Sequence, residues 1–163
     1  METQLELLIK ECVLYTANGK VTDYIPELSK ADPDMLGAYI IDEEGRASFS
    51  GDYMQPFTIQ SIVKTILLLQ ALIDNGAETV SAKIGVEATG KPFDAINVTE
   101  QRLDSKHLNP MVNMGAILMC TLIAGNTYEE RFLRVLELTR KLSCNPEIDI
   151  DRNVYLSEKN VRK

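Results

Sequence analysis

Apolar residues recur at helical spacing near the start of the chain. Thr3 and Glu6 stand three apart at the head of this run, in the pattern of a capping box. Gly19 follows the run, and glycine commonly ends a helix. The pattern therefore predicts a helix that begins after Thr3, has one apolar face and stops before Gly19. The positions that define this face are Leu5, Leu8, Ile9, Cys12 and Val13.

A β-hairpin is predicted in the next part of the chain. The segments LGAYII (residues 36–41) and RASFSG (residues 46–51) are short and strand-like, and the four residues DEEG separate them. Acidic residues and glycine favour a tight turn, so we expect the two segments to pair as antiparallel strands.

The longest apolar segment predicts a helix that is buried on most sides. Residues 59–76, IQSIVKTILLLQALIDNG, carry apolar side chains nearly all round the helix and end at Asn75-Gly76, a common helix stop. Glycines and prolines then predict irregular structure over residues 77–111.

Two further helices are predicted after this irregular segment. Residues 112–124, VNMGAILMCTLIA, are apolar and compact. Asn126 is the predicted N-cap of residues 127–143, TYEERFLRVLELTRKLS, and Asn145-Pro146 ends that helix. Its predicted apolar face consists of Phe132, Val135, Leu136 and Leu142.

Composition is typical of a globular chain of about one domain. Of its 163 residues, 45% are hydrophobic and 25% are charged. A net charge of -7 without a basic block argues against a nucleic-acid surface, which needs clustered Lys and Arg. The longest apolar run is far shorter than the roughly 20 residues that span a bilayer, and the first residues lack the basic start of a signal peptide. We therefore expect a cytoplasmic protein that does not enter a membrane.

Cysteine and histidine usage limits the chemistry. Cys12, Cys120 and Cys144 are an odd number of cysteines at unrelated spacings, so we expect reduced thiols that fill small core positions. His107 is the single histidine, which excludes a multi-histidine metal site. A Ser-His-Asp triad would need His107 itself as the base, and its surroundings, DSKHLNP, are typical of a loop.

Two segments imitate ligand-binding motifs without completing them. Residues 85–92, GVEATGKP, have the glycine and lysine spacing of a phosphate-binding loop, but Pro92 stands where a Ser or Thr hydroxyl is needed. Residues 149–153, DIDRN, have the spacing of a calcium loop, but Val154 stands where that loop needs glycine. We expect a loop at the first place and a capped turn at the second.

Ser61 and Lys64 stand three apart at the head of the predicted buried helix. Side chains at this spacing have Cβ atoms about 5–6 Å apart, so a lysine amine can reach a serine hydroxyl. We expect Ser61 in the first helical turn, where the helix dipole and the apolar surroundings disfavour an ammonium ion and allow Lys64 to act as a base. A packed helix whose Lys64 extends to solvent also explains these residues, so the spacing alone leaves both interpretations open.

Five separated segments, taken in order, resemble one family. They are GKVTDYIPELSKADPDMLG, GDYMQPFTIQSIVK, GVEATGKPF, LNPMVNMGAI and VYLSE. Over residues 19–158 the chain is similar to the glutaminases, which are serine-dependent, β-lactamase-like amidohydrolases that convert L-glutamine to L-glutamate and ammonia without a metal or organic cofactor.

The resemblance implies roles for particular residues. Ser61 would be the nucleophile that also contacts the substrate, and Lys64 would be its base. Asn113 and Glu158 would bind the amino-acid end of glutamine, and Tyr24 would line the pocket. An amide and a carboxylate suit the carboxylate and ammonium groups of that end.

The resemblance also implies an α+β fold of the β-lactamase/transpeptidase-like glutaminase type, present here in part. We expect residues 1–76 to hold a helix, the hairpin and the nucleophile helix of the α/β part, and residues 77–163 to hold loops and part of the helical subdomain. The likeness stops at Lys163, near the midpoint of a family catalytic domain, so we expect this chain alone to be inactive or weakly active. The open edges of a lone hairpin further predict a homo-oligomer.

Two alternatives stay open at this point. One is a related acyl-serine enzyme that acts on a β-lactam or another amide. The other is a non-catalytic helical interaction module.

Overall fold

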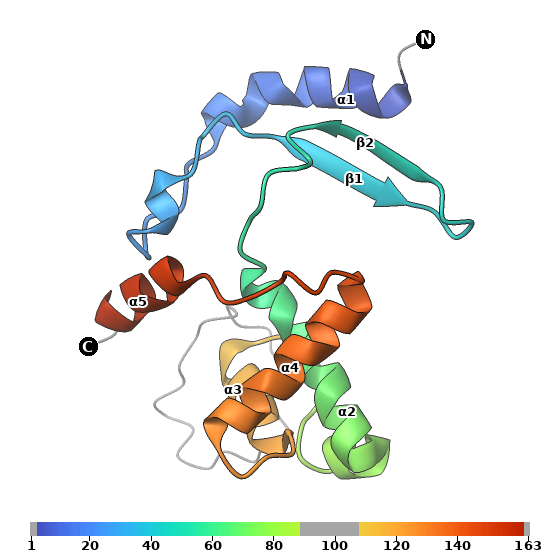
Figure 1. The fold of residues 1–163 in the computed structure, drawn as a ribbon, viewed down its shortest axis with the longest axis vertical. Coiled ribbons are helices and arrows are strands. Elements are labelled where there is room, and N and C mark those ends of the chain that lie inside the picture. Colours follow the sequence, from blue (N-terminus) through green and yellow to red (C-terminus); the bar gives the residue numbers. More distant parts are fainter. Residues whose placement is uncertain (1–2, 89–107, 162–163) are drawn as a thin grey trace. The chain divides into compact units, whose positions relative to one another are not determined.

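A computed structural model describes residues 3–88 and 108–161 of the chain (Figure 1). The chain divides into two units, which are described separately: unit 1 comprises Met1–Thr58 and Ile150–Lys163, and unit 2 comprises Ile59–Asp149. Residue 76, where the α/β part of the glutaminase domain is predicted to end, lies within unit 2, and the predicted division of the domain stays a prediction. The helices and strands, in chain order, are α1 (Gln4–Cys12), β1 (Gly37–Ile41), β2 (Ala47–Gly51), α2 (Val63–Ser81), α3 (Asn113–Leu122), α4 (Tyr128–Ser143) and α5 (Arg152–Val161).

The predicted first helix of unit 1 is confirmed. The Glu6 N–H donates to Thr3 Oγ1 at 3.2 Å and the Thr3 N–H donates to Glu6 Oε2 at 2.6 Å, which completes the capping box. Hydrogen bonds to the Glu6 carboxylate, first from the Thr3 N–H and then from the Thr3 side chain, hold the pKa of Glu6 below its ordinary value. The chain continues from α1 into a 3₁₀ helix, Val13–Asn18, before Gly19.

The predicted hairpin is also confirmed. β1 and β2 pair antiparallel, with Tyr39 opposite Phe49, and the two rings stack with centroids 5.7 Å apart. At the open end of the hairpin, Gly51 has a φ of +68°, and a Cβ there would lie 2.2 Å from the Leu36 carbonyl oxygen. Only glycine fits this position without moving the main chain.

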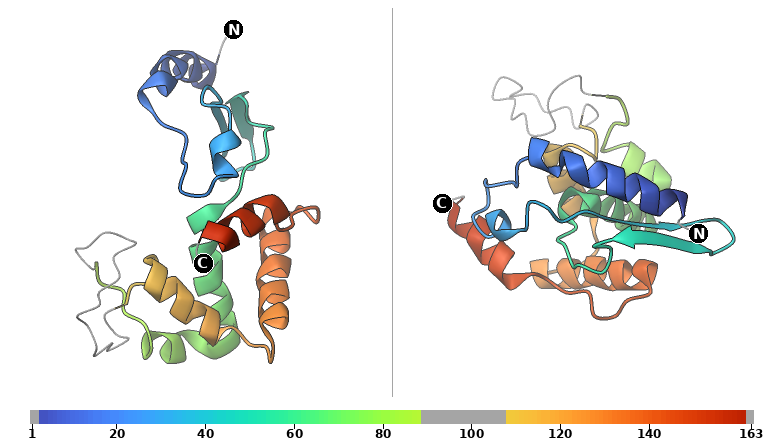
Figure 2. Two further views of the ribbon diagram at one scale, coloured as in Figure 1. Left: turned by 90° about the vertical axis from the view of Figure 1, so that its left-hand side faces the viewer. Right: turned by 90° about the horizontal axis from the view of Figure 1, so that it is seen from above.

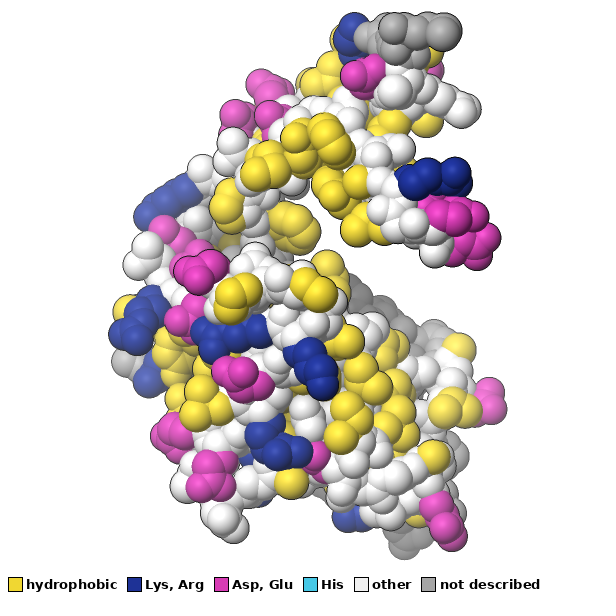
Figure 3. All heavy atoms as spheres, turned by 45° about the vertical axis from the view of Figure 1, so that its right-hand side comes forward, with side chains coloured by type: hydrophobic (Ala, Val, Ile, Leu, Met, Phe, Trp, Pro, Cys, Tyr) yellow, Lys and Arg dark blue, Asp and Glu magenta, His cyan; other side chains and the backbone are white. Residues whose placement is uncertain are grey.

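Helix α1 packs against the hairpin in unit 1, as both views of Figure 2 agree. Ile9 of α1 lies beside Gly51 of β2. A Cβ atom added to this glycine would be only 3.2 Å from Ile9 Cγ2. Apolar side chains nevertheless stay on the surface of the molecule (Figure 3). Tyr39, Ile40 and Ile41 of β1 are all more than half exposed. The described hairpin therefore offers apolar surface as well as two open strand edges.

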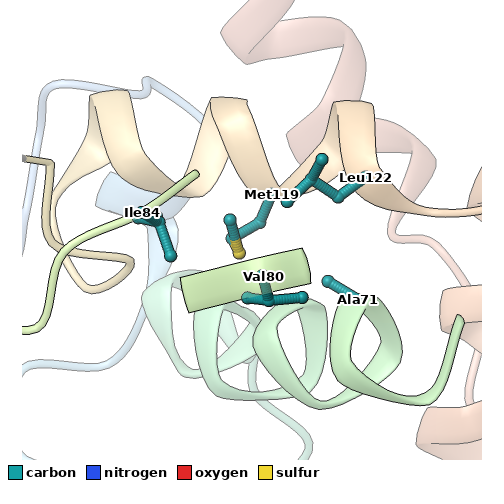
Figure 4. Close-up of a cluster of buried hydrophobic side chains, with 5 residues drawn as sticks. All are labelled: Ala71, Val80, Ile84, Met119 and Leu122. Atoms are coloured by element: carbon teal, nitrogen blue, oxygen red, sulfur yellow. The ribbon is translucent and has the colours of Figure 1, made fainter. Parts of the chain in front are cut away.

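Unit 2 contains the hydrophobic core, which α2, α3 and the segment after α2 build together (Figure 4). α2 also packs against α4. Met119 and Ala71 are fully buried in this core, and each buried large apolar side chain contributes about 1.5–3 kcal/mol through removal from water. The core side chains shown in Figure 4 are Ala71, Val80, Ile84, Met119 and Leu122.

Helix α2 departs from the predicted end at Asn75-Gly76. Gly76 interrupts the helix with φ 78° and ψ 160°, as a glycine can, but helical structure resumes and reaches Ser81. The prediction of irregular structure from residue 77 is therefore wrong for residues 77–81. The resumed segment places Val80 in the core, and this packing accounts for the extra helical turn.

Helix α4 begins at a different cap from the one predicted. Thr127, not Asn126, is the N-cap, because Thr127 Oγ1 accepts the Glu130 N–H at 3.2 Å. Asn126 instead donates its own N–H to Glu130 Oε2 at 2.6 Å. Leu136 lies on the buried face as predicted, whereas Phe132 and Leu142 are exposed.

The buried carboxylate of Asp74 joins α2 to α4 and to the segment before it. Its Oδ1 accepts from Gln70 Nε2 at 2.9 Å and from Arg134 Nη2, and its Oδ2 accepts the Ala124 N–H at 2.8 Å. Burial raises the pKa of Asp74, but the hydrogen bonds from Ala124, Arg134 and Gln70 outweigh burial and hold that pKa below its ordinary value. Asp74 is therefore a fixed, ionised tie between these parts of unit 2.

The cysteines correct a further prediction. All three are free thiols, as expected, but Cys12, Cys120 and Cys144 are exposed, so the prediction that they fill core positions is wrong. The buried residues of α3 are Gly115, Ala116, Met119 and Leu122, whereas Cys120 is exposed. Its thiol is still partly covered, and this burial raises the pKa of Cys120 above its ordinary value.

Two further observations apply to residues 3–88 and 108–161 only. No helix there combines the length and apolar character needed to cross a bilayer. His, Cys, Asp and Glu side chains there do not gather into groups of three that could hold a metal ion. His107 and residues 89–92 of the glycine-lysine segment 85–92 lie outside the described residues.

Candidate functional site

Ser61 lies on a 3₁₀ helix, Gln60–Ile62, that leads directly into α2. The prediction that it occupies the first α-helical turn is therefore wrong, although it still stands at the N-terminal end of α2. Gln60, the residue before it, has a φ of 44°, which is left-handed backbone that a glutamine rarely adopts. Such strain clusters at functional sites. Ser61 itself is exposed.

Lys64 is the second residue of α2 and is buried, with 7% of its surface exposed. Its Nζ donates to Asn113 Oδ1 at 2.7 Å and to the Met111 carbonyl oxygen at 3.1 Å. The interpretation that Lys64 extends to solvent is therefore wrong. A buried amine requires hydrogen-bond acceptors, and unit 2 supplies these two from a segment 47 and 49 residues further along the chain.

Asn113 is the first residue of α3 and is half-buried. Val112 occupies the N-cap position of this helix, and no side chain caps it there. The Asn113 side chain points its oxygen at Lys64 instead. Two residues that the resemblance assigns to one site are thus in direct contact.

The tight turn before α3 places both acceptors of the Lys64 amine. The Val112 N–H donates to the Asn109 carbonyl oxygen at 3.1 Å, and the Met111 N–H donates to Asn109 Oδ1 at 2.8 Å. The sequence did not predict a role for Asn109 or Met111. Asn109 acts by holding a turn, and Met111 acts through its main-chain carbonyl oxygen, which any residue carries. The Asn-Pro pair directly ahead of a helix was the available signal.

Tyr24 and Glu158 lie in unit 1, on neighbouring segments. Tyr24 is exposed and precedes the buried Ile25, while Glu158 is a half-buried residue of α5. The Glu27 N–H donates to Ser157 Oγ at 3.2 Å, which ties the segment after Tyr24 to the helix that carries Glu158. The predicted residues thus form two groups, one in each unit.

The predicted capped turn before α5 is present. Asp151 Oδ1 accepts the N–H groups of Asn153 and Val154, both at 3.0 Å. This carboxylate therefore starts the helix that carries Glu158, as an N-terminal Asp commonly does.

The arrangement in unit 2 has the parts of a nucleophilic site. A serine hydroxyl is exposed at a helix start, a buried amine follows one helical turn later, and two uncharged oxygens orient that amine. A serine with an adjacent amine can carry out acyl transfer, with the amine taking and returning a proton.

Comparison with known proteins points to one family. A family model described as Glutaminase matches residues 19–163. The chain is 48% identical over 159 residues to a glutaminase of Clostridium tetani and 46% identical over 159 residues to glutaminase 2 of Clostridium perfringens. Each match covers 98% of this chain and 52% of the relative. The chain thus spans about half the length of these curated relatives.

A solved structure shares the fold. It is the covalent complex between the Bacillus subtilis glutaminase YbgJ and 5-oxo-L-norleucine, formed by reaction of that protein with 6-diazo-5-oxo-L-norleucine. The likeness has a TM-score of 0.82 at 25% identity and covers 98% of this chain and 48% of that one. This confirms the predicted partial α+β fold.

Proposed function

Because the chain belongs to the glutaminase family, we propose that it supplies Ser61 as nucleophile and Lys64 as base for the hydrolysis of L-glutamine to L-glutamate and ammonia. Asn113, Glu158 and Tyr24 are proposed to bind the substrate. The observation that carries the proposal is the buried Lys64 amine, which Asn113 Oδ1 and the Met111 carbonyl oxygen hold one helical turn after Ser61.

Burial of Lys64 favours a catalytic role over a packing role. A lysine that only covers apolar surface keeps its charged end in water. Lys64 instead has its amine inside unit 2, where Asn113 Oδ1 and the Met111 carbonyl oxygen accept hydrogen bonds from it. These contacts hold the amine one helical turn after Ser61, where a base would take the serine hydroxyl proton.

The reaction follows from these positions. Ser61 Oγ attacks the side-chain amide carbon of glutamine while Lys64 Nζ takes the hydroxyl proton. The C–N bond then breaks, the proton passes to the departing nitrogen, and ammonia leaves a glutamyl ester on Ser61. Water, deprotonated by Lys64, attacks the ester, and Ser61 regains its proton as glutamate departs. No metal or organic cofactor enters these steps.

The proposed substrate contacts suit a zwitterionic amino acid. Asn113 uses its oxygen on Lys64, so its side-chain NH₂ group is the part proposed to donate to the substrate carboxylate. The Glu158 carboxylate is proposed to pair with the substrate ammonium, and Tyr24 to line the pocket.

The share of the family length that the chain covers limits the activity proposed for it alone. The Ser61 N–H is proposed as one oxyanion donor, and loss of a second donor lowers the rate by about 10²–10³. Since the chain spans 52% of its curated relatives, we propose that it is inactive or weakly active by itself.

One set of assays tests both parts. The chain and the full-length Clostridium tetani glutaminase would be incubated with L-glutamine, and glutamate would be measured for each. A rate for this chain at least about 10²-fold lower supports weak activity, whereas a comparable rate that Ser61→Ala abolishes contradicts it.

The chemistry is tested separately by mass spectrometry after treatment with 6-diazo-5-oxo-L-norleucine. An adduct on Ser61 that Lys64→Met prevents supports the proposed pair. An adduct on a cysteine but not on Ser61 contradicts it.

We also propose that the chain self-associates through its hairpin. The exposed apolar side chains of β1 and the open strand edges of the described hairpin support this. Light scattering after size exclusion tests it: Ile40→Lys, on exposed β1, should shift a dimer toward monomer, and a monomeric wild-type chain contradicts the proposal.

A further inference from the structure

We propose that Asn109 is a positioning residue for the Lys64 amine and that it acts through the main chain of Met111. The inference rests on the function proposed above, because it concerns the base of that reaction. Asn109 is assigned no contact with substrate.

The Asn109 side chain joins two segments that are remote in sequence. Its Nδ2 donates to the carbonyl oxygens of Val86 at 3.3 Å and Glu87 at 3.1 Å, while its Oδ1 accepts the Met111 N–H at 2.8 Å. Both ends of the amide are therefore engaged, and in opposite senses. A residue that offered only a donor or only an acceptor would hold one of the two segments and release the other.

The main chain around Asn109 is fixed as well. Its carbonyl oxygen accepts the Val112 N–H at 3.1 Å, and Pro110 restricts the backbone at the second position of the turn. The first turn of α3 presses on the same carbonyl, because a Cβ on Gly115 would lie only 1.9 Å from the Asn109 oxygen. Glycine at 115 thus permits this close approach, which leaves the turn little room to shift.

The turn determines where the Lys64 amine finds its acceptors. Met111 is held at its N–H by Asn109 and presents its carbonyl oxygen to Lys64 Nζ at 3.1 Å. Asn113 follows two residues later and presents the second oxygen at 2.7 Å. Loss of the Asn109 side chain would free the Met111 end of this pair. A misplacement of about 1 Å can lower a catalysed rate about 10²-fold.

The test compares three substitutions of Asn109 in the full chain. Asn109→Ala removes every side-chain contact. Asn109→Gln keeps an amide but moves its oxygen one methylene further out, away from the Met111 N–H. Asn109→Ser keeps a nearby oxygen that can accept this N–H in a serine turn. The matched control is Asn145→Ala, because Asn145 Oδ1 accepts the Glu147 N–H at 2.9 Å in a similar turn that does not contact Lys64.

Two readouts are measured for each variant. The first is the NMR signal of the two Lys64 Hε protons in lysine-labelled chain, which differ in chemical shift only while the side chain is held in one orientation. The second is the rate at which a fluorophosphonate probe modifies Ser61, a step in which the Oγ–P bond forms, fluoride leaves and the hydroxyl proton passes to Lys64.

We expect separate Lys64 Hε signals in the wild type, in Asn109→Ser and in Asn145→Ala. The signals should merge in Asn109→Ala and Asn109→Gln, and Ser61 modification should slow about tenfold in both. Should Asn109→Ala not fold, the contrast between the Gln and Ser variants decides the question.

Separate signals in a folded Asn109→Gln chain, or signals that merge equally in Asn145→Ala, would overturn the inference. Failure of the probe to modify wild-type Ser61 counts against the proposed function instead. The Lys64 signals need no reaction, so they test Asn109 in either case.

Discussion

Replacement of Asp74 by asparagine tests the tie between α2, α4 and the segment before α4. The side chain of Asp74 is only 3% exposed, and its two oxygens accept hydrogen bonds from Gln70, Arg134 and the Ala124 N–H. Asparagine has almost the same shape but replaces one oxygen with an NH₂ group. In either orientation of this amide, its NH₂ group replaces an oxygen that accepted a hydrogen bond. At least one of the three donors therefore loses its acceptor.

The expected loss follows from these contacts. An unsatisfied buried donor costs about 1–3 kcal/mol. The lost attraction to Arg134 adds little, because the Arg134 side chain is 44% exposed and water can replace the carboxylate. Asp74→Asn should therefore lower the free energy of unfolding by about 1–3 kcal/mol. For a chain of this size that corresponds to a fall in Tm of about 2–12 °C.

The pH dependence gives a second check with a defined sign. The pKa of Asp74 is lowered in the folded chain from its ordinary value of 3.8. Its contribution to stability is therefore fully present above that ordinary value and is lost as the pH falls through the lower folded value. The difference between wild type and Asp74→Asn should be constant near neutral pH and should shrink as the pH falls below about 4.

Urea unfolding followed by circular dichroism measures these differences. The control is Asp23→Asn, because the Lys20–Asp23 pair is largely exposed on both sides and should give no measurable change. An Asp74→Asn chain within about 0.5 kcal/mol of wild type at pH 7 would refute the reasoning.

Three further outcomes are expected. Met119→Ala should lower the free energy of unfolding by about 2–5 kcal/mol, because the side chain is fully buried. The control, Ile117→Ala, lies on the exposed side of the same helix and should change this free energy by less than about 0.5 kcal/mol. Equal losses in the two variants would contradict the assigned core. Gly115→Ala should lower the free energy of unfolding by about 1–3 kcal/mol in the same urea assay, because the new Cβ meets the Asn109 carbonyl oxygen. This loss should outweigh the better helix propensity of alanine. A variant more stable than the wild type would show that the close approach to Asn109 is absent. Burial raises the pKa of Cys120, so iodoacetamide should modify this thiol more slowly at pH 8 in the folded chain than in urea. Mass spectrometry would measure the two rates. Equal rates would argue against burial of the thiol.

Local patterns predicted the elements whose stabilising contacts are near in sequence. The Thr3–Glu6 capping box formed as expected, since both partners lie within one helical turn. The hairpin followed from its turn residues, and its register was set by the four-residue connection. The family and the partial α+β fold followed from five motifs in order. The family match over residues 19–163 confirms the family, and the likeness to a solved glutaminase structure confirms the fold.

Errors arose where neighbouring residues could serve equally well. Asn126 and Thr127 are both good N-caps, and the choice depends on which side chain reaches the Glu130 N–H. Gly76 is a plausible helix end, yet the packing of Val80 in the core extends α2 beyond it. Cys120 could have faced either side of α3, and core packing through Met119 turned it outward.

The sequence by itself placed Ser61 and Lys64 one helical turn apart, because residues three apart are neighbours on a helix. It left open whether Lys64 reaches solvent or lies inside, since a lysine side chain is long enough for both. Only the tertiary structure decided this, by bringing Met111 and Asn113, nearly fifty residues away, against the amine. A buried amine persists only where acceptors meet it, and those acceptors come from a turn that folding, not spacing, places beside α2.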